Sequence, residues 1–144
     1  MVSIEIGARL VSHLAPKSQL LVKEVQKEDW ETAWKAHYSL LKIGRKIVIR
    51  PSWIKYKPTD GEVIVSLDPG MAFGTAEHGT TRGCLRLLSE VVKVDERILD
   101  IGSGSGILAI AAAALGVSEV IAIEGDPASF QALQSNAERN EVCS

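Results

Sequence analysis

The chain has 144 residues, of which 46% are hydrophobic and 24% are charged, and its formal net charge at pH 7 is −2. These values are typical of one globular domain, or of one domain with an appendage. The small charge gives no electrostatic reason to expect direct binding of nucleic acid, and the longest apolar stretch, residues 107–115, is too short to span a bilayer.

Cysteine usage and the first residues of the chain bear on its compartment. Cys84 and Cys143 lie in unrelated contexts, and neither has the spacing of a metal ligand. The mixed charges that begin at Glu5 argue against a secretory signal. We therefore expect a reduced, cytoplasmic protein with no metal site and no membrane partner.

The first part of the chain predicts a mixture of helices and strands. Residues 4–14 predict a helix, 20–25 predict a short strand, and 28–38 predict a helix with three aromatic residues on one face: Trp30, Trp34 and Tyr38. Core packing explains this aromatic face better than ligand contact does. Residues 46–50 and 62–67 predict two further strands, and the proline-containing and aromatic connector between them predicts an ordered loop.

A glycine-punctuated segment, residues 68–81, follows the second of these strands. Its length favours a loop that folds over a ligand, with a threonine hydroxyl and helix-start N–H groups facing a carboxylate. A plain connection is the alternative. A lone loop histidine such as His78 is more often a surface or hydrogen-bonding residue than a catalytic one. Neither His78 nor Glu77 is assigned as a general base, so the catalytic residues stay unknown.

A helix is predicted directly after this segment, with Thr80 or Thr81 as its N-cap. Apolar residues recur there at helical spacing and predict the face that turns inward: Cys84, Leu87, Leu88 and Val91. Cys84 therefore falls on the apolar face of the predicted helix.

The most informative segment is residues 98–113, in which an apolar strand ends at Asp100 and three glycines precede an apolar helix. Gly102, Gly104 and Gly106 allow the backbone to approach a ligand closely, and the helix start adds unpaired N–H groups. This spacing resembles the first motif of S-adenosylmethionine-dependent methyltransferases, because a dinucleotide fingerprint would place its third glycine at Ile107. A strand–turn–helix that merely needs glycines is the alternative.

A second strand, residues 120–123, supports the prediction of a cofactor site. Glu124 follows it at the distance from Gly102 at which an acidic residue meets a ribose, so its carboxylate could accept hydrogen bonds from both ribose hydroxyls. Asp126 and Pro127 suit the N-cap and first position of a helix over residues 127–139. The alternative is that both acidic residues only cap this helix.

Five segments together make the chain resemble the ribosomal protein L11 methyltransferases: EDWETAWKAHY, IVIRPSW, SLDPGMAFGTAEHGTTRGCL, LDIGSGSGILAIAA and NAERN. The resemblance covers residues 22–140, and DPGMAFGT is its distinctive part. It implies transfer of methyl groups from S-adenosyl-L-methionine to amino groups, mainly of lysine, on a large-subunit ribosomal protein. It also implies cofactor contacts from Thr81, Gly102 and Glu124, beside the turn residues Asp100 and Gly104.

The sequence departs from this family at two positions. The family usually has aspartate where this chain has Glu124, whose carboxylate reaches one methylene further. It commonly has glycine where this chain has Ala76, which argues against a positive φ at that position.

The resemblance implies an α/β, Rossmann-like methyltransferase fold that is incomplete at the C-terminus and carries a remnant of an N-terminal α+β domain. Residues 1–28 would be that substrate-recognition remnant with its linker, and 29–144 would be the N-terminal half of the methyltransferase domain. The later strands and an Asn-Ile-Leu-Ala motif of the family are missing. An unpaired sheet edge is therefore expected near residues 120–123.

Two other functions stay open on the sequence alone. A nicotinamide-dependent oxidoreductase is disfavoured by Ile107 in the third glycine position. A non-catalytic, truncated nucleotide-fold module that pairs with another chain is the stronger alternative. Activity of this chain by itself is a separate question, and we expect it to be inactive.

Overall fold

The computed structural model describes residues 38–68, 76 and 78–142. The chain divides into two compact units, Met1–His37 and Tyr38–Ser144, and all described residues belong to the second unit. The elements expected between residues 4 and 37 lie outside the described residues, and so does most of the segment 68–81.

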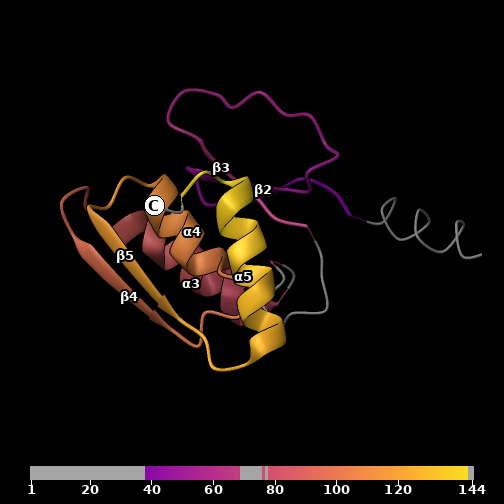
Figure 1. Ribbon diagram of the computed structural model, residues 1–144. Coiled ribbons are helices and arrows are strands. Elements are labelled where there is room, and N and C mark those ends of the chain that lie inside the picture. Colours follow the sequence, from indigo (N-terminus) through magenta and orange to yellow (C-terminus); the bar gives the residue numbers. More distant parts are fainter. Residues whose placement is uncertain (1–37, 69–75, 77, 143–144) are drawn as a thin grey trace, which may run out of the picture. The chain divides into compact units, whose positions relative to one another are not determined.

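The described residues form two small sheets and three helices (Figure 1). Their elements, in chain order, are β1 (Leu41–Ile43), β2 (Ile47–Arg50), β3 (Val63–Ser66), α3 (Gly79–Val91), β4 (Arg97–Ile101), α4 (Ile107–Ala114), β5 (Glu119–Ile123) and α5 (Pro127–Arg139). The first sheet has the order β1-β2-β3, with β1 antiparallel and β3 parallel to β2, and the second pairs β4 with β5 in parallel. The unit β4–α4–β5 is the strand–turn–helix–strand arrangement that the glycine segment predicts.

Helix α4 lies at the centre of the packing and contacts α3, α5, β3, β4 and β5. Its sequence, ILAIAAAA, is apolar on every side, which is typical of a helix that is enclosed by other elements. Together with Ile47 and Val65 of the first sheet and Leu85 of α3, its residues Ile107 and Ile110 form the core of the described unit.

The inward face of α3 differs from the predicted one. Leu85 and Ser89 are buried, whereas Cys84 is exposed, Leu87 is 59% exposed and Val91 is 56% exposed. A polar residue therefore occupies the buried face, because the Ser89 hydroxyl donates to the Arg86 carbonyl at 2.7 Å and needs no other acceptor. Of the four residues predicted for the inward face, Leu88 is half-buried and packs against the core as expected, whereas the other three are exposed.

Two further details correct the sequence-based predictions. His78 is the N-cap of α3, so Thr80 and Thr81 lie inside the first turn rather than at the cap. Strand β1 was not predicted, since three residues are too few for a recognisable alternation. In contrast, Asp126 is confirmed as the N-cap of α5, where its Oδ2 accepts from the Ser129 N–H at 2.8 Å, and Pro127 begins the helix.

The connector between β2 and β3 is tied down by side chains, as an ordered loop requires. Tyr56 Oη donates to Glu62 Oε2 at 2.6 Å, and the Lys42 ammonium lies 2.7 Å from Glu62 Oε1. The Ser52 N–H and hydroxyl both donate to Asp68, at 2.7 and 2.9 Å. The connector is therefore joined both to β1 and to Asp68, the second residue after β3.

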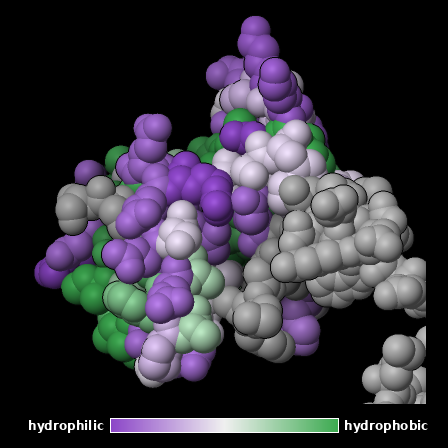
Figure 2. Space-filling view, turned by 45° about the vertical axis from the view of Figure 1, so that its right-hand side comes forward, coloured by the Kyte–Doolittle hydropathy of each residue, from purple (hydrophilic) through white to green (hydrophobic). Residues whose placement is uncertain are grey.

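Large hydrophobic side chains are also left at the surface. In the face drawn in Figure 2, hydrophobic residues gather in one area among hydrophilic ones. On the β4–β5 sheet, the outward residues alternate with half-buried ones, and four of them are exposed: Leu99, Ile101, Ile121 and Ile123. One face of this sheet is therefore without cover from the described residues.

Candidate functional site: the glycine turn between β4 and α4

The three glycines after β4 all adopt left-handed backbone conformations. The φ angles are 72° at Gly102, 55° at Gly104 and 79° at Gly106. A side chain strongly disfavours this region, so the turn depends on glycine at these positions. The N–H groups of Gly102 and Ser103 donate to the Ile123 carbonyl at 2.8 and 3.1 Å, which fixes the turn to the end of β5.

Two of the glycines differ in their surroundings. A Cβ atom at Gly102 would meet nothing within 4 Å, so the backbone there faces open space. A Cβ atom at Gly106 would lie 3.1 Å from Leu133 Cγ on α5, so this glycine permits close helix packing. Gly102 thus offers an accessible backbone surface, while Gly106 serves the fold.

Glu124 closes the turn from the neighbouring strand. Its Oε2 accepts from the Gly104 N–H at 2.7 Å, and its Oε1 accepts from the N–H groups of Gly125 and Asp126 at 2.8 and 2.9 Å. The hydrogen bonds from Asp126 and Gly104 hold the pKa of Glu124 below its ordinary value. The Glu124 carboxylate therefore joins the glycine turn to the loop between β5 and α5, and Glu124 is not the N-cap of α5.

The hydrogen bonds of Glu124 limit what it can offer a ligand. A carboxylate has about four acceptor positions, and three are occupied by backbone N–H groups. One position on Oε2 is left, so one ribose hydroxyl can be accepted in this arrangement. Acceptance of two hydroxyls requires the release of one backbone N–H.

Asp100 lies at the end of β4, beneath the turn. Burial raises the pKa of its carboxyl group, hydrogen bonds to it oppose the shift, and the nearby Glu124 carboxylate adds to it. Its Oδ2 atom is buried and has no hydrogen-bond partner within the described part of the chain. Such an orphaned acceptor fits a site that a polar ligand completes, because buried polar atoms are rarely left unpaired.

The other predicted residues lie at the start of α3. Thr81 is half-buried in the first turn of this helix, and the exposed His78 ring has its Nδ1 atom 2.6 Å from Thr80 Oγ1. Within the described residues, the N-cap residue His78 makes no side-chain capping hydrogen bond to α3. The structure brings Asp100, Gly104 and Glu124 together, but no interaction joins Thr81 to them among the described contacts.

Ala76 shows how the chain tolerates its departure from glycine. It is buried in the hydrophobic core, and Glu141 is the only non-glycine residue with a positive φ in the described ranges. The methyl group of Ala76 is therefore part of the core. Glu77 lies outside the described residues.

Sequence reasoning missed two supports of the turn. The Ser103 hydroxyl donates to the Asp100 carbonyl at 2.9 Å, and the buried amide of Asn136 on α5 donates to the Ser105 carbonyl at 2.9 Å. A serine between glycines is an ordinary turn residue, and an asparagine 31 positions further along carries no signal of this contact.

A glycine turn at the C-terminal end of parallel strands, closed by an acidic residue from the next strand, defines a Rossmann-like nucleotide-binding unit. The solved structure of a ribosomal protein L11 methylase from Lactobacillus delbrueckii subsp. bulgaricus resembles this chain with a TM-score of 0.63 and 39% sequence identity. The match covers 73% of this chain and 54% of the solved one. The α/β, Rossmann-like methyltransferase fold is thus confirmed.

Comparisons of sequence identify the same family. The family model described as ribosomal protein L11 methyltransferase (PrmA) matches residues 4–144. Two relatives are named ribosomal protein L11 methyltransferase, one from Chloroflexus aurantiacus and one from Herpetosiphon aurantiacus. They are 46% and 44% identical to this chain, over 92% and 96% of its length. The chain belongs to the ribosomal protein L11 methyltransferase family, which leaves the oxidoreductase alternative without support.

The matches cover less than half of the length of each of these two relatives. This chain spans 40% and 43% of the lengths of those two proteins. Within the described residues, no helix is long and apolar enough to cross a membrane, and no group of three or more potential metal-ligating side chains is gathered.

Proposed function

We propose that this chain is part of an S-adenosylmethionine-dependent protein N-methyltransferase that modifies lysine side chains of a large-subunit ribosomal protein. The observation that carries the proposal is the open, left-handed glycine turn closed by Glu124, in a member of the L11 methyltransferase family. In this proposal, residues 1–28 belong to a substrate-recognition domain and its linker, and 29–144 belong to the methyltransferase domain.

Five residues are proposed to hold the cofactor. The backbone at Gly102 and Gly104 would lie against it, and the free acceptor position of Glu124 would take a ribose hydroxyl. The orphaned Oδ2 atom of Asp100 is a further acceptor at the turn. Thr81, in the uncapped first turn of α3, would face the carboxylate of the cofactor.

The proposed methyl transfer requires mainly that the protein align the cofactor with the amine of the substrate. When bound, S-adenosylmethionine supplies an electrophilic methyl group to a neutral lysine amine. The turn and Glu124 would orient the cofactor and hold its ribose, which is a contribution of position rather than of proton transfer. No general base is assigned among the described residues.

The names of the relatives support the proposed substrate and are compatible with the proposed compartment. These proteins are named as methyltransferases of ribosomal protein L11, and a ribosomal substrate favours the cytoplasm. The net charge of −2 gives no electrostatic reason to expect a direct nucleic-acid partner, and the proposal includes no nucleic-acid, membrane or metal partner.

Calorimetric titration of the chain with S-adenosylhomocysteine tests the cofactor site. The Gly102→Asp variant is expected to weaken binding at least about tenfold, because a side chain would fill the open space and a negative charge would face Glu124 and Asp100. Gly61→Asp is the matched control, since Gly61 has a φ of 79° and also faces open space, but lies in the connector before β3.

The two variants together separate specific binding from general damage. Saturable binding that Gly102→Asp loses and Gly61→Asp retains supports the proposal. Equal weakening in both variants, or no binding by the folded unaltered chain, contradicts it.

Transfer to the substrate needs its own measurement. The chain is incubated with methyl-labelled S-adenosylmethionine and purified ribosomal protein L11, and the hydrolysed protein is analysed for N-methyllysine. Label in N-methyllysine supports the proposed reaction, and label in another residue contradicts the lysine specificity. No label agrees with the expectation that this chain is inactive by itself, and the titration then remains the test of the cofactor site.

The alternative function is a non-catalytic module that pairs with another chain. The exposed apolar residues of the β4–β5 sheet favour it, since monomeric proteins rarely expose such residues together. A folded chain that binds no S-adenosylhomocysteine but forms a stable complex with a second polypeptide would support this alternative.

A further inference from the structure

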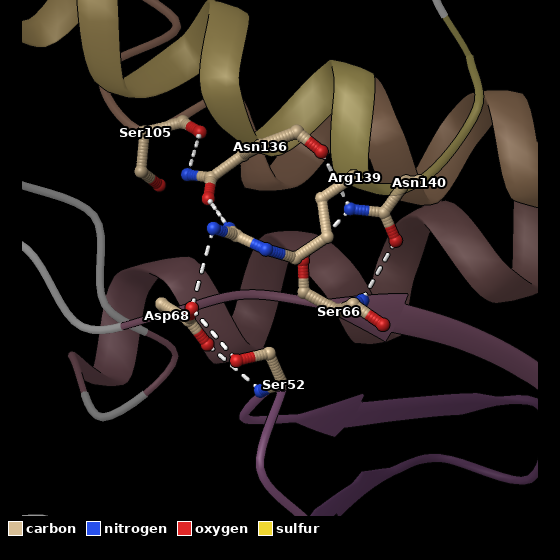
Figure 3. A network of polar contacts seen from close by, with 7 residues as sticks. All are labelled: Ser52, Ser66, Asp68, Ser105, Asn136, Arg139 and Asn140. Carbon is tan, nitrogen blue, oxygen red and sulfur yellow. Dashed lines mark hydrogen bonds and ion pairs between the residues drawn. The ribbon is translucent and has the colours of Figure 1, made fainter.

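The NAERN motif at the end of α5, residues 136–140, has no role in the cofactor site proposed above. Three of its side chains extend from α5 toward the glycine turn and the end of β3 (Figure 3). They are Asn136, Arg139 and Asn140, and their partners lie in two segments that are far apart in the sequence. This arrangement raises the question of what the motif holds together.

Asn136 makes the contact with the glycine turn. Its Nδ2 atom donates to the Ser105 carbonyl at 2.9 Å, and Ser105 stands between Gly104 and Gly106. Both residues are buried, with 5% of the surface of each exposed. Water therefore cannot replace the amide easily, and removal of the donor would break a buried hydrogen bond to the turn.

Arg139 sets the orientation of that amide. Its Nη1 atom donates to Asn136 Oδ1 at 2.9 Å, which leaves Asn136 Nδ2 directed at Ser105. Its Nη2 atom lies 3.2 Å from Asp68 Oδ2, and Asp68 also accepts from Ser52. Asp68 is the residue that precedes the segment 69–75.

Asn140 holds the same helix end to β3. Its Oδ1 atom accepts from the Ser66 N–H and its Nδ2 atom donates to the Ser66 carbonyl, both at 2.7 Å. β3 is the outer strand of its sheet in the described part of the chain, so this side chain pairs with backbone groups at the strand edge. The Asn140 Nδ2 atom also donates to the Asn136 carbonyl at 2.7 Å, but no described contact joins the Asn140 side chain to the glycine turn.

The contacts of this network differ in how deeply they are buried, and the buried ones contribute more to holding the turn. Arg139 and Asp68 keep 33% and 28% of their side-chain surfaces exposed, and an ion pair of this kind contributes little by itself. The Asn136 amide is buried and serves both the turn and Arg139. Asn136 is therefore the principal member of the network.

We infer that Asn136, with Arg139, is a positioning residue that holds the glycine turn at a fixed place relative to Asp68, which lies two residues beyond the end of β3. Neither side chain would contact the cofactor. The inference rests on the proposed function, because its consequence for binding exists only if the turn holds S-adenosylmethionine.

Amide hydrogen exchange tests the positioning without any ligand. The Gly106 N–H, which donates to the Ser103 carbonyl at 2.8 Å, reports on the turn, and the slowest amides of each variant report on global unfolding. Asn136→Asp keeps the side-chain shape but removes the donor to Ser105. Exchange at Gly106, relative to the slowest amides, is expected to rise at least about tenfold.

Two further variants complete the test. Asn140→Asp is the matched control, because its amide contacts the main-chain carbonyl of Asn136 but neither the Asn136 side chain nor the glycine turn. It should change the relative rate less than about threefold. Arg139→Met keeps the aliphatic stem and should give an intermediate rise, which preserves the test if Asn136→Asp fails to fold. Two results overturn the inference. The first is an equal rise in the exchange rate in Asn136→Asp and Asn140→Asp. The second applies if Asn136→Asp does not fold, and it is an unchanged exchange rate in Arg139→Met.

Titration with S-adenosylhomocysteine then separates the inference from the proposed function. The dissociation constant should rise at least about tenfold in Asn136→Asp and less than about threefold in Asn140→Asp. An unchanged constant in Asn136→Asp overturns the role in cofactor binding. If the unaltered chain binds nothing, the proposed function fails, and the exchange rates alone decide whether Asn136 holds the turn.

Discussion

Gly106 and Gly61 share a φ of 79° but differ in what surrounds them. Alanine at either position meets the left-handed strain of about 1 kcal/mol, and at Gly106 its Cβ would also lie 3.1 Å from Leu133 Cγ. We expect Gly106→Ala to lower the free energy of unfolding by about 2–4 kcal/mol and Gly61→Ala by about 1 kcal/mol. Urea denaturation measures both, and equal losses would contradict the packing role of Gly106.

Glu62 gives a prediction for acid stability. Hydrogen bonds from Lys42, Tyr56 and Thr59 lower its pKa from 4.5 to about 2. A carboxyl group whose pKa is depressed on folding stabilises the protein above its unfolded pKa, and this contribution disappears as the pH falls from about 4.5 to about 2. The urea midpoint of Glu62→Gln should therefore fall less between pH 6 and pH 3 than that of the unaltered chain. Parallel pH profiles would contradict this account.

At the scale of elements, α3 tests the corrected helix face. Leu85 is fully buried and Leu87 is 59% exposed, because residues two positions apart lie on opposite sides of a helix. Leu85→Ala should cost about 2–5 kcal/mol of unfolding free energy, and Leu87→Ala should cost less than about 0.5 kcal/mol. The reverse order in a denaturation experiment would restore the face that apolar spacing predicts.

Most of the elements could be predicted because their sequence signals are local. The helix of residues 127–139 begins at an Asp-Pro pair, and the strand before Glu124 is a compact apolar run, so both agree closely with α5 and β5. The face of α3 could not be predicted, because Ser89 satisfies its hydroxyl within the helix.

The candidate site was predictable in its composition but not in its contacts. The glycine spacing and the acidic residue after the next strand identify the turn and Glu124. The three backbone donors to Glu124 and the support from Asn136 depend on how α5 and the loops pack, which no short pattern records.

At the scale of the whole molecule, the uncovered face of the β4–β5 sheet predicts association. Leu99, Ile101, Ile121 and Ile123 expose apolar surface together, and such a face tends to bind other apolar surfaces. The double variant Ile101→Thr, Ile123→Thr keeps the β-branched shape and should lower the apparent mass measured by light scattering at high concentration. An apparent mass that does not change would show that this face does not drive association.

The cofactor site is the central claim, and a nuclear magnetic resonance titration of the chain with S-adenosylhomocysteine tests it most directly. The backbone amides of Gly102, Gly104 and Gly125 should shift together and give one dissociation constant, because they belong to the turn and to the loop that Glu124 joins to it. Saturating shifts at these amides would establish the site. A folded chain whose turn amides stay unchanged at millimolar ligand would contradict it.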